Sequence, residues 1–363
     1  MSADVILVIV VVTALAFDFT NGFHDTANVV ATVISTRALP PRLAVTFAAI
    51  LNFAGAFISL KVAATIANGI VNATQITMTI VFAGLVGAIA WNLATWYYGL
   101  PSSSSHALIG GLVGSAVVAE GFSAIDGHGL LSKVIVPALI APVLAFVVAG
   151  SAILVTYRIA GRVRPGPVTR GYKLGQLASG GLLALSHGTN DAQKTMGIIT
   201  LALVAHGNIS ATDFHVPDWV VVASASAIAL GTYSGGWRII RTMGSRIIKM
   251  DAAQGFSAQS AGATVILAAS HFGYPLSTTH VINGGIMGAG AAKRLSAVRW
   301  GVAGSIVTAW VLTLPAAAIG GGLVYGVTRI FGTGATGPVV VSALILLAIT
   351  ALFTTRARQA VAA

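Results

Sequence analysis

The sequence contains no cysteine and few charged residues. Of its 363 residues, only 8% are Asp, Glu, Lys or Arg, whereas 56% are hydrophobic, and the mean hydropathy is +0.89. The lack of cysteine excludes disulfide bonds and thiolate metal sites. Charged residues make up about a quarter of an average soluble domain. Because a chain with so few of them cannot cover a water-facing surface, we expect lipid to surround much of it.

Long apolar segments follow one another along the chain. About 20 apolar residues are needed to cross the hydrocarbon core of a bilayer as a helix. The sequence has eleven candidate segments, two of them interrupted, which predicts an all-α membrane protein. The short, glycine-rich segments near 102 and 276 fit either a re-entrant hairpin or a full crossing. The eleven segments are 5–35 (interrupted), 42–61, 76–98, 102–119, 130–157, 174–205 (interrupted), 219–237, 252–272, 276–292, 300–328 and 338–354.

The net charge of +11 raises the question of a nucleic-acid partner. If residues 37–42 are cytoplasmic and the segments alternate, most Lys and Arg fall in connections on that same side. This is the positive-inside pattern of a membrane protein. It explains the charge without nucleic acid. The pattern predicts a multi-pass protein of the cell's inner (plasma) membrane, with its N-terminus outside and its C-terminus cytoplasmic.

Two stretches of the first half recur in the second half. Residues 101–114 read PSSSSHALIGGLVG and residues 275–288 read PLSTTHVINGGIMG, with six identical positions. Upstream, residues 20–34 align with 186–200, so that Gly22 matches Gly188 and Asp25 matches Asp191. Each half has an odd number of expected crossings, so the two copies enter the membrane from opposite sides. This predicts inverted-topology repeats, the architecture of many secondary transporters.

A basic stretch divides the chain nearly in half. Residues 158–173 contain two prolines and three glycines. They predict a cytoplasmic linker between a first transmembrane repeat, 1–157, and a second, inverted repeat, 174–331. Residues 338–354 predict an additional C-terminal transmembrane helix.

Three aspartates, Asp18, Asp25 and Asp191, lie inside apolar segments. A carboxylate in the bilayer is costly and usually faces an ion, a cavity or a partner. Gly22 and Gly188 predict helix breaks, and carbonyl groups exposed there would form oxygen-rich cation sites with the carboxylates. The simpler alternative is that the aspartates cap broken helices and pair with nearby hydroxyls. The polar residues of these clusters are Asp18, Asn21, Asp25, Asn28, Asn190 and Asp191.

Each copy of the serine motif places proline and hydroxyl residues before an apolar helix. This pattern predicts a helix start, where free N–H groups and the positive end of the helix dipole suit phosphate or a similar oxyanion. The alternative is that two helix caps only pack against neighbouring helices. Together with the carboxylates upstream, the two Ser/Thr-rich hairpins predict an anion site beside cation sites.

Five accessory side chains accompany these motifs: His24, His106, His187, Lys194 and His280. Lys194 either neutralises Asp191 or meets an anion. His106 and His280 either donate to the anion or only pack. His24 and His187 lie in the acidic clusters, where histidine can titrate near neutral pH.

Four motifs together resemble the signatures of the inorganic phosphate transporter (PiT) family, most closely its bacterial low-affinity permeases. They are NGFHDTANVVATVI, GLPSSSSHALIGG, LSHGTNDAQKTMGI and PLSTTHVINGG, in the order of the family. The resemblance implies a secondary transporter, not an enzyme, that imports inorganic phosphate with H⁺ or Na⁺ by alternating access. It implies no cofactor, although proton-coupled bacterial members are thought to carry phosphate as a neutral complex with a divalent metal.

The resemblance also implies roles for individual residues. Asp25 and Asp191 become the main coupling carboxylates. Sodium-coupled relatives typically have Asn-Asp in both copies, so the His24–Asp25 pair favours protons. The oligomeric state stays open, and a homodimer is compatible with the sequence. The implied phosphate ligands are Ser103, Ser104, Ser105, Ser277, Thr278 and Thr279, with Gln193 beside them.

Three rival functions fit parts of the pattern. A carrier for another oxyanion, such as sulfate, could use the same scaffold. A passive anion channel would leave the carboxylates inside the membrane unexplained. A membrane hydrolase with a Ser-His pair is disfavoured, because no nucleophile motif stands beside a suitably placed base.

Overall fold

The protein is a bundle of helices. The computed structural model describes residues 3–210, 214–332 and 334–362, and in these ranges the sole β pairing is an isolated bridge between Val71 and Ile125. This confirms the predicted all-α class. The α-helices are α1 (Ala3–Ser35), α2 (Pro41–Gly55), α3 (Lys61–Asn68), α4 (Met78–Tyr98), α5 (Ser104–Glu120), α6 (Gly127–Leu130), α7 (Val136–Ala160), α8 (Pro165–His206), α9 (Asp218–Ser234), α10 (Trp237–Arg241), α11 (Ala252–His271), α12 (Thr278–Lys293), α13 (Trp300–Ile330) and α14 (Thr336–Ala362).

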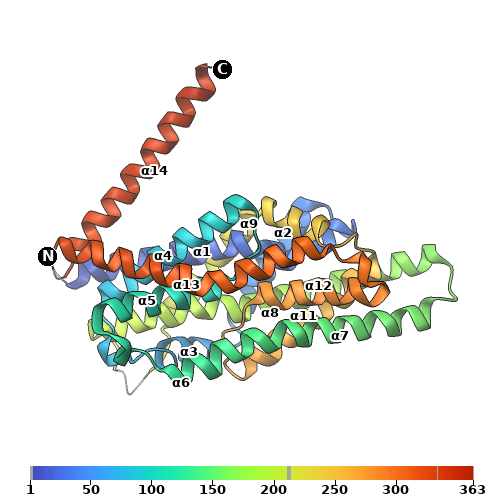
Figure 1. The fold of residues 1–363 in the computed structure, drawn as a ribbon, viewed down its shortest axis with the longest axis horizontal. Coiled ribbons are helices and arrows are strands. Elements are labelled where there is room, and N and C mark those ends of the chain that lie inside the picture. Colours follow the sequence, from blue (N-terminus) through green and yellow to red (C-terminus); the bar gives the residue numbers. More distant parts are fainter. Residues whose placement is uncertain (1–2, 211–213, 333, 363) are drawn as a thin grey trace.

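Most of the long helices lie roughly along the long axis of the molecule, whereas α14 leaves the bundle at an angle (Figure 1). In the described part of the chain, four helices are long and apolar enough to cross a membrane: Ala3–Ser35, Met78–Tyr98, Gly127–Ala160 and Trp300–Ile330. A fifth span results if the bent pair α9 and α10 is counted as one. Large apolar side chains are exposed on α7 and α13, for example Leu139 and Val311. Such faces suit lipid rather than water.

The breaks predicted at Gly22 and Gly188 are wrong, because α1 and α8 run through both positions without interruption. The glycines serve close helix packing instead. A Cβ atom at Gly22 would lie 2.3 Å from the carbonyl oxygen of Ile228 in α9, and one at Gly188 would lie 2.1 Å from that of Asn52 in α2. Only a residue without a side chain permits this approach of two helix backbones. The aspartates therefore project from continuous helices.

Two further segments differ from expectation. The segment 42–61 forms two helices, since α2 ends at Gly55 and α3 begins at Lys61. Most of the predicted linker at 158–173 is helical, because α7 continues to Ala160 and α8 already begins at Pro165. Proline favours the first position of a helix, where its missing N–H costs nothing. Of the charged residues that suggested a linker, Arg170 and Lys173 lie on the first turns of α8, and Arg162 and Arg164 lie in the short connection before it.

The two serine motifs lie at the ends of helical hairpins. Helices α4 and α5 pack together and are joined by a short loop, and α11 and α12 form the second hairpin. We call residues 99–105 the first tip and residues 272–279 the second tip. Residues 101–105 and 275–279 are buried. The tips meet inside the bundle, where the Ser105 hydroxyl donates to the Leu276 carbonyl oxygen at 3.0 Å.

The packing of the two hairpins is exchanged between the halves of the chain. Helix α5 of the first half packs along α13 of the second, and α12 of the second half packs along α7 of the first. Figure 1 shows both pairs side by side. The exchange places the first tip and the second tip against the middle of α1 and α8, which carry the buried aspartates.

Candidate functional site

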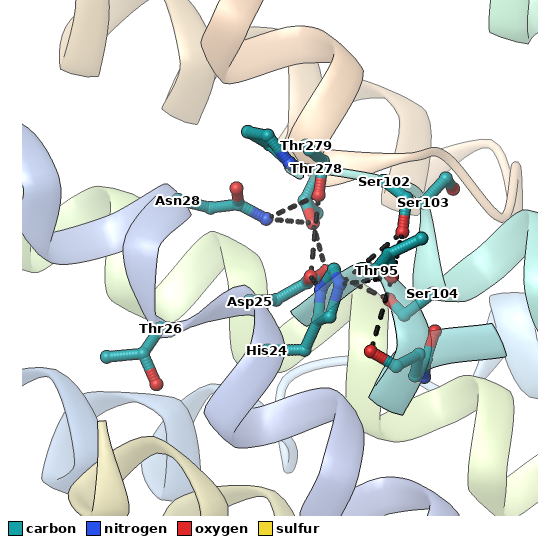
Figure 2. A network of polar contacts seen from close by, with 12 residues as sticks. His24, Asp25, Thr26, Asn28, Thr95, Ser102, Ser103, Ser104, Thr278 and Thr279 are labelled. Carbon is teal, nitrogen blue, oxygen red and sulfur yellow. Dashed lines mark hydrogen bonds and ion pairs between the residues drawn. The ribbon is translucent and has the colours of Figure 1, made fainter. Parts of the chain in front are cut away.

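Asp25 lies where the two tips meet. Its carboxylate is 2% exposed and accepts a hydrogen bond from the Ser104 hydroxyl of the first tip at 2.9 Å. From the second tip, the Thr278 and Thr279 hydroxyls lie 3.4 Å from its two oxygens. Figure 2 shows Asp25 with the threonines on one side and Ser104 on the other. Hydroxyls from both halves of the chain thus converge on one negative group.

One serine of each tip has a different task. Ser103 is the N-cap of α5 and accepts from the His106 N–H at 3.1 Å, and Ser277 is the N-cap of α12 and accepts from the His280 N–H at 3.2 Å. An N-cap fixes the start of a helix by satisfying one of its free N–H groups. Both helices therefore start at the site with their positive ends toward it.

Two neighbours on α1 complete the surroundings of Asp25. His24 Nδ1 lies 2.7 Å from Asp25 Oδ1. The Asn28 amide, one turn further along, donates to the Thr279 and Thr278 hydroxyls at 2.9 and 3.2 Å. Asn28 therefore aims the hydroxyl protons of the second tip away from its own side chain and toward the carboxylate.

Asp191 is fully buried on α8 and has nitrogen partners on two sides. The Lys194 ammonium donates to Asp191 Oδ1 at 2.5 Å, and His187 Nε2 lies 3.3 Å from Oδ2. The Thr278 hydroxyl lies 3.4 Å from Asp191 Oδ2, the same distance as from Asp25 Oδ2. Because a hydroxyl has one proton, Thr278 can donate to only one of the two carboxylates at a time.

The two aspartates are close enough to share a cation. Asp25, His187 and Asp191 each offer a ligand atom, and these atoms all lie within 4.8 Å of one another. Carboxylate oxygen and imidazole nitrogen are ligands for divalent transition metals, and the oxygens also suit Na⁺ or Mg²⁺. The chemistry of this group therefore fits either a monovalent cation or a divalent metal ion.

A second polar cluster lies one to two turns before Asp25 on α1. Asp18 and Asn21 are 0% and 1% exposed, and none of their side-chain oxygens or nitrogens has a hydrogen-bond partner. The buried Thr195 hydroxyl on α8 is also without a partner. Buried polar groups are usually satisfied, and an exception indicates an ion, a water or a functional role. This cluster is a further candidate for a cation.

Two predicted site residues have different partners from those expected. Gln193, an implied phosphate ligand, accepts from the Val62 N–H at 2.8 Å at the start of α3, and its amide donates to the Thr189 carbonyl oxygen. Both ends of its amide are thus held by backbone groups. Asn190 donates to the Ser270 hydroxyl at 2.9 Å. Neither side chain contacts the hydroxyls of the site.

His106 and His280 pack against each other behind the tips. Their ring centroids are 4.8 Å apart in an edge-to-face arrangement, and His280 also stacks on Trp310 at 4.1 Å. Neither ring nitrogen of His280 has a hydrogen-bond partner. The contacts of this pair are those of packed rings, and they join the first turns of α5 and α12.

Several polar residues of the site were missed in the sequence. Thr95 of α4 lies 3.1 Å from His24 Nε2 and accepts from the Ser102 hydroxyl at 2.8 Å. Asn52 of α2 lies 3.3 Å from His187 Nδ1 and donates to Thr232 at 2.8 Å. Both are uncharged polar residues within apolar segments, which is a weaker signal than an ionisable residue in the membrane.

The sequence matches the phosphate transporter family at residues 21–169 and 160–321. It is 51% identical over 355 residues to a probable low-affinity inorganic phosphate transporter of Mycobacterium tuberculosis, covering 98% of this chain and 85% of that one. It is 44% identical over 324 residues to the protein of the same name from Bacillus subtilis, covering 88% and 96%. Among solved structures, one described as the sodium-dependent phosphate transporter superimposes with a TM-score of 0.81 at 25% identity, covering 90% of this chain and 99% of that one.

Proposed function

Since the chain belongs to the phosphate transporter family, we propose that it imports inorganic phosphate with a co-transported cation, H⁺ or Na⁺, by alternating access. Its relatives are transporters, so a membrane hydrolase finds no support. The family and the apolar helices make it an integral membrane protein. We place it in the plasma membrane, with the N-terminus outside and the C-terminus in the cytoplasm.

One observation carries the proposal, namely that hydroxyls of both tips converge on the Asp25 carboxylate. Ser104 donates at 2.9 Å, and the Thr278 and Thr279 hydroxyls lie at 3.4 Å. A carboxylate presents the same kind of acceptor as a phosphate oxygen. Donors that surround one oxyanion can surround another, and the starts of α5 and α12 add N–H groups and a favourable dipole. We infer that phosphate binds at these hydroxyls.

The shared hydroxyls give a physical reason for coupling. A hydroxyl that donates to Asp25 has no proton left for phosphate. A cation bound at the carboxylate takes over the stabilisation of its charge, which frees Ser104 and Thr278 to donate to the anion. Each ligand then strengthens the binding of the other by the same factor, as linkage requires.

The membrane potential opposes the import of an anion, and a coupled cation offsets this cost. Moving one negative charge inward against 100 mV costs about 2.3 kcal/mol, and a phosphate dianion costs about twice as much. Cations that enter with phosphate offset this cost. Asp18 and Asp25 are the buried carboxylates without a Lys or Arg partner among the described residues, and they are the groups that would hold these cations, since Asp191 already pairs with Lys194.

A metal–phosphate complex would also fit this arrangement. The ligand atoms of Asp25, His187 and Asp191 lie within 4.8 Å of one another, directly beside the hydroxyls of the second tip. A divalent metal held by these atoms would lie between the carboxylates and the bound phosphate and would compensate the negative charge of the phosphate. The metal in this case is part of the cargo.

The way the two hairpins pack supports alternating access. The exchanged packing of α5 with α13 and of α12 with α7 is what two inverted repeats would produce. The close contacts agree, since Gly22 meets α9 and Gly188 meets α2 through matching glycines of the two copies. We propose that one repeat unit rocks against the other around the tips.

The decisive experiment measures radiolabelled phosphate uptake by the purified protein in liposomes. Gradients of H⁺, Na⁺ and a divalent metal ion are imposed one at a time. A symporter accumulates phosphate against its gradient under at least one of them. Uptake that never exceeds equilibration under any gradient would indicate a passive channel and refute the proposal. Inhibition by excess unlabelled phosphate but not by sulfate is expected, and equal inhibition by both would indicate a general oxyanion carrier.

A further inference from the structure

Lys194 is a buried cation at the centre of the molecule. Its side chain is 1% exposed, and it is the sole buried Lys or Arg within the described part of the chain. The ammonium donates to Asp191 Oδ1 at 2.5 Å, to the Ser105 hydroxyl at 2.5 Å and to the Leu276 carbonyl oxygen at 2.9 Å. All three of its protons are therefore engaged, and none is left for an anion.

The surroundings of this ammonium are those of a small bound cation. A carboxylate, a hydroxyl and a backbone carbonyl approach it from α8, the first tip and the second tip. Sites for Na⁺ in transporters are built from the same oxygen types, with carbonyls of irregular backbone beside a carboxylate. The ammonium has the same charge as Na⁺ and contacts the same kinds of oxygen.

The other copy of the motif has a neutral residue at the corresponding place. The alignment that pairs Asp25 with Asp191 pairs Asn28 with Lys194, three residues further on. Asn28 also reaches the opposite hairpin, donating to Thr279 at 2.9 Å. Both residues thus connect an aspartate-bearing helix to a tip, but only Lys194 brings a positive charge. No Lys or Arg contacts Asp25 in an ion pair among the described residues.

We propose that Lys194 is a tethered monovalent cation that fills the subsite at Asp191, so that a cation from solution binds at Asp25 instead. The inference rests on the proposed function and specifies which of the two carboxylates is open to the co-transported ion. It makes Lys194 a determinant of how many cations accompany each phosphate, and it assigns Lys194 no direct contact with phosphate.

The test replaces the charge and asks whether a cation from solution takes its place. Lys194→Asn gives the second copy the residue of the first and leaves room, whereas Lys194→Met keeps the length without the charge. The probes are Na⁺ and methylammonium, which copies the lost head group. Binding of each to the purified full-length protein is followed by equilibrium binding and by the thermal unfolding temperature. Lys61→Asn, which removes an exposed lysine of α3, is the matched control.

We expect Lys194→Asn to bind about one more cation per chain than the wild type, with a saturable rise in unfolding temperature. Lys194→Met and Lys61→Asn should gain none, and Asp191→Asn added to Lys194→Asn should abolish the gain. If Lys194→Asn folds only in the presence of methylammonium or Na⁺, the proposal is also supported. A Lys194→Asn protein that gains nothing from either ion, or that stays unfolded with both, overturns it.

These measurements separate the inference from the proposed function. Cation binding is read without any phosphate flux, so the result stands whether or not the wild type accumulates phosphate in liposomes. A wild type that does not accumulate phosphate would refute symport alone. A wild type that transports phosphate, together with a Lys194→Asn variant without a new cation site, would refute the tethered cation alone.

Discussion

Asp25 in α1 and Asp191 in α8 stand at matching positions of a repeated motif, and their partners differ. Asp25 accepts from Ser104 at 2.9 Å and has His24 as its nitrogen partner, while Asp191 is held by the Lys194 ammonium at 2.5 Å. The duplicated carboxylates are therefore unequal in charge balance. One faces donors that an anion can share, and the other lies in a buried ion pair. Two copies of one motif can thus have different roles, one in binding and one in structure.

The largest effect on transport is expected at Asp25. Asp25→Asn keeps the size of the side chain, replaces one accepting oxygen by an NH2 donor and removes the charge that attracts the coupled cation. We expect phosphate uptake in liposomes to fall at least about 100-fold, which corresponds to about 2.7 kcal/mol, while the protein remains monodisperse and folded. Uptake at the wild-type rate would show that Asp25 is not the coupling carboxylate.

The largest effect on stability is expected at Asp191. Asp191→Asn leaves the Lys194 ammonium buried without its counter-ion, and breaking a buried ion pair in this way costs about 3–5 kcal/mol. Asp191→Asn combined with Lys194→Met removes both charges and should recover most of the lost unfolding temperature. The double variant therefore separates the cost of an unpaired charge from the loss of the aspartate. Equal destabilisation of the single and the double variant would contradict the ion pair.

Two adjacent serines of the first tip have different hydrogen-bond partners, so their substitution separates binding from stability. Ser104 donates to Asp25, whereas Ser103 caps α5. A hydrogen bond to a charged group contributes about 1.5–3 kcal/mol, so Ser104→Ala should weaken phosphate binding about 10- to 150-fold. Ser103→Ala should mainly lower stability, by about 1 kcal/mol. Phosphate binding and thermal unfolding of both variants measure the contrast, and a stronger binding defect in Ser103→Ala would reverse the assigned roles.

The helical class, the positions of the two serine motifs and the buried aspartates could be predicted from the sequence, because each depends on local pattern. Charged residues are scarce, hydroxyls precede an apolar run at both tips, and Asp25 and Asp191 lie in apolar segments. Contacts between residues of different helices could not be predicted in this way, because they depend on which helices become neighbours. Examples are the contact of Gln193 with the start of α3 and that of Thr95 with His24.

The role of an internal glycine also could not be predicted from the sequence. In a soluble helix an internal glycine weakens the helix by about 1 kcal/mol relative to alanine, so a glycine such as Gly22 or Gly188 predicts a break. In a packed membrane bundle the same residue allows two backbones to approach. Composition alone does not distinguish the two uses, since the deciding fact is the carbonyl oxygen of Ile228 on another helix.

Substitution of these glycines tests the packing interpretation. A methyl group at Gly22 would lie 2.3 Å from a backbone oxygen, which the helix cannot accommodate without moving. Overpacking of this kind costs about 1–3 kcal/mol, so Gly22→Ala should lower the unfolding temperature. Gly301→Ala in α13 meets nothing within 4 Å and is the matched control. An unfolding temperature that Gly22→Ala leaves unchanged would contradict the packing interpretation.

The smallest effect is expected at Gln193, and it distinguishes a binding residue from a structural one. Its side-chain oxygen accepts from the Val62 N–H at 2.8 Å, and so it acts as a cap for α3 supplied from α8. Loss of a helix cap costs about 1 kcal/mol. Gln193→Ala should therefore lower the unfolding temperature slightly. It should change phosphate affinity by no more than about twofold, because the side chain contacts backbone groups and not the hydroxyls of the site; a tenfold loss would correspond to about 1.4 kcal/mol. A tenfold loss of affinity without a loss of stability would place Gln193 among the phosphate ligands, as the resemblance of the motif implies.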